Sequence, residues 1–466
     1  MNGDEPDEVH PVRLSENSGN PSVTRGRTLA DVTLLVLLCG LLFFFRIGVS
    51  PLQEPDETRC AKIVREMLRT GNWLAPHLDG KLYLDKPAPF FWLAAVGYRL
   101  TGSMALGGRG VAGVSGILMV LVTYFFARRI FDRRVGFLAG IVLATTAGPL
   151  LVARWLRMDM PFAAAMWTAT WCFWWSQTPS GRRDPARRRR GWCGFYAFCA
   201  FATLFKGPAG LVLPVMFVGT YLLLSGRPRR VLEFFSVPGM LLYLLIAAPW
   251  FVTVSIYEPT CLYRFLIQQN FGLYLAPLGS RHHFSPFLYL PILLVGQLPW
   301  TSLLPAVCTR YFPRRWRLRK RSPGILLLWV QVFVTLLFFA LSRTRAPHYI
   351  LPAFPPLAVM TAGVMVGWIR SRGDDSVLTG GPAALVATVI SLLVLVVVGE
   401  SWVGNADRWL VVPVAACMLG VVGIWVSLRY DNCTWCVIST IATIVVIVLF
   451  SVGYAIPSGC RLLNLR

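Results

Sequence analysis

The sequence predicts an all-α, polytopic membrane protein with about 13 transmembrane helices. Of the 466 residues, 55% are hydrophobic and only 14% are charged, a composition too apolar for a soluble domain. Apolar runs of about 20 residues, the length that crosses a bilayer as a helix, recur along the chain. The Lys and Arg residues are concentrated in short loops between these runs, where such charges set membrane topology.

The predicted spans begin at residue 29 and end at residue 456. They cover residues 29–49, 109–130, 134–153, 160–177, 192–205, 208–225, 235–256, 287–308, 324–341, 347–369, 382–400, 408–428 and 434–456. The span 192–205 is short for a bilayer. Phe90–Leu100 is too short to cross one, so we assign it to the membrane surface or to a re-entrant segment.

The distribution of basic residues tests this arrangement. With a cytoplasmic N-terminus, the inner loops hold 23 of the 45 Lys and Arg residues, as the positive-inside rule requires. Counting Phe90–Leu100 as a full span would move every later basic loop to the outer side. The segments expected on the outer side are Glu54–Pro87, Arg154–Asp159, Lys206–Pro208, Tyr257–Pro286 and Ser342–Tyr349.

Three regions follow from this pattern. Residues 1–28 are polar and are expected to form a disordered cytoplasmic tail. Residues 29–370 form the main transmembrane module, and residues 371–466 add C-terminal transmembrane helices. No small-residue cleavage site follows the first apolar run, so this run is expected to remain as an uncleaved span. The functional outer loops of the main module are expected at 50–108, 153–160 and 257–286.

The net charge of +23 and the 11 Cys residues do not by themselves indicate a function. Nucleic-acid binding is not predicted, because the basic residues lie in loops that determine topology. Cys433 and Cys436 form a single CxxC without a second pair or a neighbouring His. We interpret them as packing residues rather than as a metal or redox site.

The first outer loop, Glu54–Pro87, is a long polar stretch with several carboxylates between two apolar regions. Within it, Thr58–Thr70 has apolar and charged residues on opposite helical faces, and Gly71 is a typical C-cap. The pattern predicts an amphipathic helix that lies on the bilayer. We expect this loop to carry the chemistry at the membrane surface.

Charged residues near both ends of this loop are candidates for the chemistry. Asp56 is either an N-cap or a carboxylate that orients or deprotonates an attacking group. Lys86 either extends to lipid headgroups or binds a phosphate. Asp85 is a candidate for binding a metal, positioning a sugar or keeping Lys86 charged.

Further cations stand at the outer ends of predicted spans, where topology statistics disfavour them. Arg157 and Asp159 form either a simple ion pair or part of a site for an anionic lipid head. Lys206 precedes a Gly-Pro turn between two spans, and Arg345 stands at a Pro-containing span entry. Together these residues predict a polyanion site on the outer face.

The outer loop 257–286 contains aromatic and amide side chains suited to covering a sugar, among them Tyr263 and Gln268. Its adjacent His282 and His283 do not form a metal site by themselves and are expected in a solvated loop. The chain has no DxD motif for a nucleotide sugar and no P-loop. A transferred sugar is therefore expected to come from a membrane lipid.

Several stretches resemble the bacterial lipid A aminoarabinose transferases and their relatives, which are membrane glycosyltransferases related to protein O-mannosyltransferases. The first outer loop matches with PDETRCAKIVREMLRTGNWLAPHLDGKLYLDKPAPFFWL. In the same order along the chain follow ARWLRMDMPF, FKGPAGLVLP, APWF, FSPFLYLPILLVGQLPWT and HYILPAFPPLA. The resemblance covers about residues 29–370 and implies the fold of the superfamily C glycosyltransferases.

The resemblance also implies roles for single residues. Asp56 matches the first-loop acid of the family and Asp159 the second-loop acid, and both are expected to be catalytic. The predicted donor- and phosphate-binding residues are Arg59, Asp85, Lys86, Lys206 and Tyr349, to which we add Arg345. Gln268–Asn270 stand where the family has a Glu-His pair resembling a metal ligand. No metal-ligating residue is therefore predicted, and a divalent cation is left open as a cofactor.

These observations predict an inverting glycosyltransferase of the inner cell membrane, with its active site on the extracytoplasmic face. It would move a monosaccharide from a polyprenyl-phosphate carrier to a lipid A-like glycolipid, a protein or a cell-envelope glycan. The alternative is a transporter or flippase of lipid-linked sugars. Such a protein should have internal repeats and charged residues at mid-bilayer, and neither is found in the sequence.

Overall fold

The computed structural model describes residues 21–178, 183–226, 228–260, 263–265, 267, 272, 285–312, 323–371, 385–390, 411–430 and 432–451. Within these ranges the chain is almost entirely helical, and one two-stranded hairpin is present. The all-α prediction is therefore confirmed. Seven described helices are long and apolar enough to cross a membrane, and a bent pair raises the number to at most eight. The predicted number of about 13 is not confirmed.

Most predicted spans form helices close to their predicted bounds, because each is a continuous apolar run that ends at charged, Gly or Pro residues. These helices are α1 (Pro21–Phe44), α4 (Arg109–Ile130), α7 (Asp159–Gln177), α9 (Pro185–Lys206), α10 (Ala209–Leu224), α11 (Val237–Tyr257), α17 (Pro323–Leu341), α18 (Phe354–Arg370), α21 (Val411–Arg429) and α22 (Cys433–Phe450). Two short 3₁₀ segments, η2 (Pro228–Phe234) and η6 (Pro347–Ala353), precede α11 and α18.

Two boundaries differ from the predictions, and a third lies mostly outside the described residues. Residues 21–28 are helical, although they were expected in the disordered tail, and residues 1–20 lie outside the described part. The short span 192–205 is the C-terminal part of the longer α9. Of the predicted span 382–400, only residues 385–390 are described, and they are helical.

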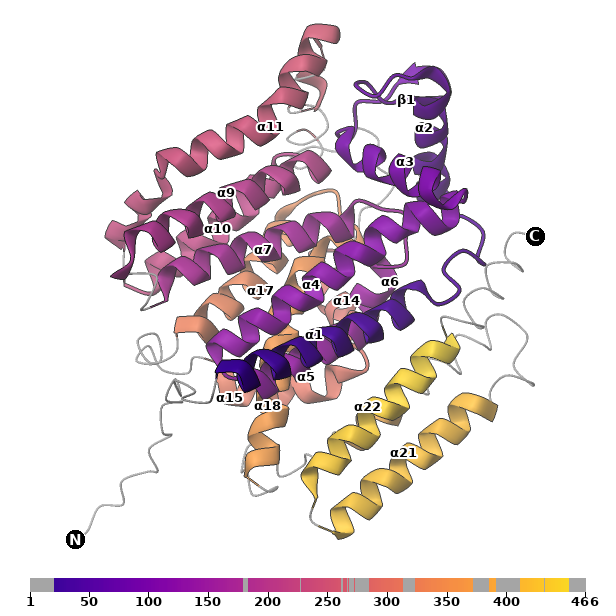
Figure 1. Ribbon diagram of the computed structural model, residues 1–466, viewed down its shortest axis with the longest axis vertical. Helices are drawn as coiled ribbons and strands as arrows, with labels where there is room; N and C mark the ends of the chain where they lie inside the picture. Colours follow the sequence, from indigo (N-terminus) through magenta and orange to yellow (C-terminus); the bar gives the residue numbers. More distant parts are fainter. Residues whose placement is uncertain are drawn as a thin grey trace.

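The helix α7 lies in the middle of the main bundle and packs against α4, α9 and α10 (Figure 1). Nearly all of its side chains are buried, which explains why its sequence is apolar on every face. The helices α21 and α22 pack against each other at one side of the bundle (Figure 1). Because α7 is fixed on several sides, a residue at its first turn has a well-defined position.

Two predicted spans are broken rather than continuous. Span 134–153 divides into α5 (Arg133–Thr145) and α6 (Ala147–Val152), and span 287–308 into α14 (Tyr289–Gly296) and α15 (Leu304–Tyr311). The second pair, with the short segments η4 (Pro286–Leu288) and η5 (Trp300–Leu303), bends by 108°. The Ala147 N–H donates to the Leu298 carbonyl at 2.8 Å. The two breaks therefore satisfy each other's backbone groups, as an apolar surrounding requires.

The loop between α1 and α4 forms a small unit with its own apolar core. It contains α2 (Asp56–Thr70), β1 (His77–Leu78), β2 (Lys81–Leu82), α3 (Pro89–Thr101) and the π-helical turn η1 (Met104–Gly108). The predicted amphipathic helix is present as α2 and ends at Gly71 with φ 71°. Its apolar face packs into a protein core that includes Phe90 and Phe91 of α3, so this face is buried in protein.

The helix α3 and the turn η1 approach each other closely at two glycines. A Cβ added to Gly97 would lie 2.3 Å from the carbonyl oxygen of Gly107, and one added to Gly107 would lie 2.0 Å from that of Gly97. Only residues without a side chain allow this backbone contact. Since α4 begins at Arg109, directly after η1, the contact sets where the outer-loop unit joins the main bundle.

Candidate active site

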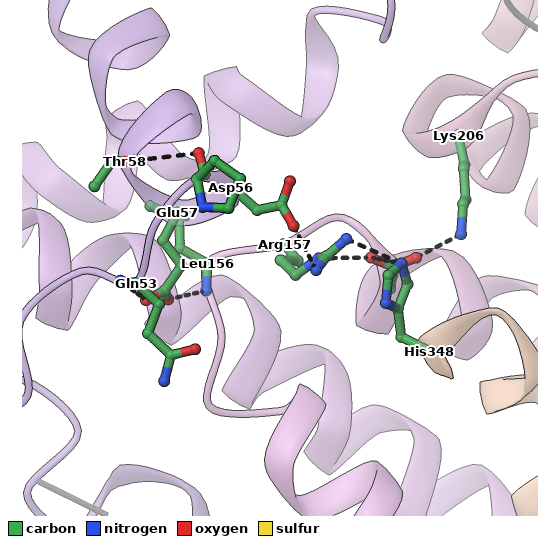
Figure 2. A network of polar contacts seen from close by, with 10 residues as sticks. Gln53, Asp56, Glu57, Thr58, Leu156, Arg157, Lys206 and His348 are labelled. Atoms are coloured by element: carbon green, nitrogen blue, oxygen red, sulfur yellow. Dashed lines mark hydrogen bonds and ion pairs between the residues drawn. The ribbon is translucent and has the colours of Figure 1, made fainter. Parts of the chain in front are cut away.

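Segments far apart in the sequence meet at one end of the bundle, where α2, α7 and η6 begin and α9 ends (Figure 2). The Arg157 guanidinium lies 2.9 Å from Asp56 Oδ2, and its Nε donates to Asp159 Oδ2 at 3.2 Å. Lys206 Nζ donates to Asp159 Oδ1 at 2.5 Å. The four side chains form a chain of alternating charge, Asp56–Arg157–Asp159–Lys206.

Asp159 is the centre of this chain. Its side chain is only 5% exposed, and it is the first residue of α7, where the helix dipole favours a negative charge. A third group, His348 Nε2, lies 3.7 Å from Asp159 Oδ2 and 2.9 Å from an Arg157 nitrogen. A buried carboxylate with several cationic neighbours is a stable counter-ion, so Asp159 fixes the positions of these groups.

The helix α9 presents Lys206 to the site because the helix ends there. Gly207 has φ 93° and its N–H donates to the Thr203 carbonyl, which closes the last turn. The Lys206 ammonium lies 4.2 Å from the centre of the Tyr349 ring and 5.1 Å from that of Phe162. The predicted Gly-Pro turn is thus confirmed, and two aromatic faces stabilise the cation beside its ion pair.

Lys86 belongs to the same electrostatic environment. Burial lowers the pKa of Lys86, and the neighbouring Lys206 lowers it further, whereas Asp159 and Asp85 act in the opposite direction. For Tyr83, burial and the charge of Asp85 both raise the pKa, because both disfavour the phenolate. The loop after β2 therefore places a partly desolvated ammonium next to the Asp159–Lys206 pair, where an added anion would be stabilised.

Arg59 lies on the adjoining face of α2. Its charge and a side-chain hydrogen bond lower the pKa of Tyr83, opposing the effects of burial and of Asp85. Arg59 also lines a cavity of about 420 Å³. Lys62 and Arg65 line the same cavity, and Lys62 pairs with Asp79 at 3.4 Å. Arg59 is therefore at the boundary between the buried charge cluster and a polar, solvent-accessible hollow.

The structure brings several of the predicted site residues together. Asp56, Asp159 and Lys206 are linked by contacts, and Tyr349 and Lys86 adjoin them. Arg345 donates to the Ala340 carbonyl at 3.0 Å, at the end of α17. Gln268–Asn270 and the pair His282–His283 lie outside the described residues, as does most of the loop 257–286.

The sequence left open whether Asp56 is an N-cap or a functional carboxylate, and whether Arg157 only pairs with Asp159. Pro55 occupies the N-cap position of α2, and Asp56 is the first helical residue, so Asp56 is not the N-cap. The ion pair between Arg157 and Asp159 is present. Arg157 is nevertheless more than a local partner of Asp159, because it also binds Asp56 and His348.

Sequence reasoning missed the central position of Arg157 and the participation of His348. His348 directly precedes Tyr349 in HYILP, so its proximity to a predicted site residue was an available signal. Among the described residues, no group of three or more His, Cys, Asp or Glu side chains has the arrangement of a metal site.

Three comparisons place this geometry among known proteins. Residues 85–252 match the family of dolichyl-phosphate-mannose-protein mannosyltransferases. The undecaprenyl phosphate-α-4-amino-4-deoxy-L-arabinose arabinosyl transferase 2 of Pseudomonas fluorescens is 30% identical over 377 residues, which are 79% of this chain and 63% of that protein. The enzyme of the same name from Proteus mirabilis is 28% identical over 91% of this chain and 76% of its own length.

In sequence the chain is similar to these aminoarabinose transferases over most of its length. It spans less than two thirds of the length of the Pseudomonas relative. The crystal structure of ArnT from Cupriavidus metallidurans bound to undecaprenyl phosphate superimposes with a TM-score of 0.76 at 23% identity, over 94% of this chain and 78% of that protein. The apo structure of the same protein gives 0.71. The chain is thus a multi-pass membrane protein with the ArnT fold.

Proposed function

We propose that this chain is an integral membrane glycosyltransferase that moves a monosaccharide from a polyprenyl-phosphate carrier to an extracytoplasmic acceptor. The observation that carries the proposal is the convergence of Lys86, Lys206 and Arg157 around Asp159, with Asp56 at the more exposed end. The relatives are named as transferases that use an undecaprenyl-phosphate sugar. The acceptor is a lipid A-like glycolipid, a protein or a cell-envelope glycan.

The cations supply the donor site. Lys86 and Lys206 bind the carrier phosphate, and Arg59 contacts it from α2. As the bond between the anomeric carbon and the phosphate oxygen breaks, negative charge grows on the phosphate and positive charge on the sugar ring. Ammonium groups held in a water-poor site stabilise that developing charge more than water does. Asp159, whose oxygens are occupied by Lys206 and Arg157, positions these cations.

Asp56 is the residue that faces the acceptor. Its side chain is 43% exposed, so an incoming group can reach it. The ion pair with Arg157 at 2.9 Å fixes the orientation of this carboxylate. Asp56 therefore orients the acceptor and takes its proton as the new glycosidic bond forms. Attack opposite the departing phosphate inverts the configuration at the anomeric carbon.

The active site faces the extracytoplasmic side in this proposal, because basic loops lie at the other ends of the helices. The mechanism draws only on side chains of this chain, and a divalent cation is left open as an additional ligand of the phosphate.

The test uses purified full-length protein in nanodiscs with an undecaprenyl-phosphate-linked sugar and an envelope lipid extract. We expect release of undecaprenyl phosphate and labelled acceptor from the wild type, and loss of both with Asp56→Asn. Arg370→Ala, at the opposite end of the bundle, is the matched control and retains transfer. An Asp56→Asn variant with wild-type transfer would remove Asp56 from this role. Translocation of intact donor across proteoliposomes without release of carrier phosphate would instead identify a flippase.

A further inference from the structure

Directly behind Asp56, a buried ion pair joins α2 to α4. Arg109 Nε donates to Glu57 Oε1 at 2.8 Å, and its Nη2 donates to Oε2 at 2.7 Å, with both side chains 3% exposed. The same carboxylate accepts the Gln53 N–H at 2.8 Å and the Leu156 N–H at 2.7 Å. Four N–H donors therefore fix Glu57 at the N-terminus of α2 (Figure 2 shows the contacts with Gln53 and Leu156).

Arg109 uses its remaining donors on the chain that leads into α2. It donates to the carbonyls of Ile47, Ser50 and Pro51 at distances of 2.7, 3.0 and 2.8 Å. The guanidinium thus binds the linker between α1 and α2 and the first turn of α2 at once. A planar group with five donors suits such a junction, and a lysine does not replace it.

The Leu156 contact connects this junction to the charged site. Leu156 directly precedes Arg157, and Glu57 directly follows Asp56, so two adjacent links join the same two segments. One is the buried bond from the Leu156 N–H to Glu57, and the other is the half-exposed pair of Arg157 with Asp56 at 2.9 Å. The buried link determines how far the turn before α7 lies from the start of α2.

We propose that Glu57, held by Arg109, is a positioning residue that sets the distance and orientation of the Asp56–Arg157 pair. Glu57 itself contacts no reacting group. Its carboxylate fixes the Leu156 amide, and through it the backbone from which Arg157 reaches Asp56 and Asp159. The inference rests on the proposed transferase function for its kinetic readout and has a structural readout that is independent of it.

A second acid–arginine pair, with a buried carboxylate and a partly exposed arginine, provides a control. Arg133 donates through two nitrogens to Asp31, at 2.7 and 2.6 Å, and the Asp31 side chain is 6% exposed. This pair lies near the other end of α4, beside Tyr124. Like Glu57–Arg109 it is a bidentate carboxylate–guanidinium pair, although Arg133 is 38% exposed, and its contacts are with α1 and α4.

The experiment compares Glu57→Gln and Asp31→Asn in the full-length protein in nanodiscs. Both variants should lower the midpoint of thermal unfolding. Glu57→Gln should in addition lower kcat by about 100-fold, the scale of a small misplacement of reacting groups, with the KM for undecaprenyl-phosphate sugar nearly unchanged because Lys86 and Lys206 remain. Asp31→Asn should leave kcat unchanged. Hydrogen exchange of a peptide covering residues 153–158 should increase only in Glu57→Gln.

A double variant, Glu57→Gln with Arg109→Met, separates positioning from stability. It removes the uncompensated guanidinium and should recover thermal stability. A single neutral amide oxygen then replaces the carboxylate that bound both the Leu156 and the Gln53 N–H groups, so kcat should stay low. The inference is overturned when kcat recovers together with stability, or when Glu57→Gln leaves exchange of residues 153–158 at the wild-type level. A wild type that transfers no sugar overturns the proposed function instead, and the exchange measurement still decides the positioning role.

Discussion

Both ends of α4 carry a bidentate acid–arginine pair, but only the beginning also adjoins a carboxylate that several groups share. Near the end of the helix, Asp31 is bound by Arg133 and the Tyr124 hydroxyl, and the neighbouring Asp132 pairs with Arg370. These are separate carboxylates, each with its own cation. Near the beginning of the helix, Asp159 is shared by Lys206, Arg157 and His348.

This difference distinguishes contacts that hold helices together from contacts that prepare a site. A bidentate pair such as Arg133–Asp31 uses the donors of one cation on one carboxylate. An ammonium has three N–H donors, and in the described part of the chain Lys206 directs one of them to Asp159. Lys86, Lys206 and Arg157 are balanced by Asp56, Asp85 and Asp159. Arg59 adds one further positive charge, which an anionic ligand can balance.

The largest expected effect is that of Asp159→Asn. The change leaves Lys206 and Arg157 buried without their shared counter-ion, so we expect a loss of about 3–5 kcal/mol in the free energy of unfolding and no detectable transfer. Thermal unfolding and the transfer assay measure the two effects. Asp31→Asn should destabilise the fold but retain transfer. Equal loss of transfer in both variants would show that the two ends do not differ in function.

The second largest effect is expected for Lys86→Ala. The loss of one cation from a phosphate site costs about 2–4 kcal/mol in transition-state stabilisation, and the fold should be retained because Lys86 lies in a loop. Steady-state kinetics with undecaprenyl-phosphate sugar should show the fall in kcat/KM. Lys86→Arg keeps the positive charge and should retain part of the wild-type kcat/KM. Unchanged kcat/KM in Lys86→Ala would exclude Lys86 from the donor site.

The pH dependence gives a third, smaller effect. Burial and Lys206 lower the pKa of Lys86 below its ordinary value of 10.5. The charged form binds phosphate, so activity should fall as pH rises through this lowered pKa, below the range in which an exposed lysine titrates. Lys86→Arg should move this alkaline decrease to higher pH, because the guanidinium stays charged. An identical alkaline limb in both proteins would assign the decrease to another group.

The smallest effect is expected for Arg370→Ala. Arg370 is 51% exposed and its partner Asp132 is 25% exposed, so solvent screens the pair and its loss should change the free energy of unfolding by less than about 1 kcal/mol. Transfer should be unchanged. A large loss of transfer in this variant would contradict the separation between the two ends of α4.

The sequence predicts the straight helices well, because their signal is local. The predicted span 109–130 coincides with α4, and 324–341 lies within one residue of α17. The broken helices were not predicted. The apolar run 287–308 has no charged interruption, and its bend is stabilised by the distant Ala147 and Thr145, which bond to Leu298 and Trp300. A hydropathy pattern contains no information on such partners.

The candidate site shows the same limit. Asp56, Lys86 and Lys206 were predicted from charge, position and resemblance, and the structure brings them to one region. The Glu57–Arg109 pair joins residues 52 positions apart, and Arg109 stands at the start of an apolar run, where a lone cation suggests a lipid contact. Its real environment is five protein acceptors, and only the folded chain shows them.

The contact between Gly97 and Gly107 has a consequence for how this protein tolerates sequence change. A methyl group at either position would push α3 away from η1, and the displacement would pass directly to Arg109 two residues later. Single substitutions at these glycines should therefore weaken catalysis without altering any charged group. A screen for inactive but well-expressed variants should therefore find substitutions at Gly97 and Gly107 as well as at the charged site residues. The cause at the two glycines would be steric.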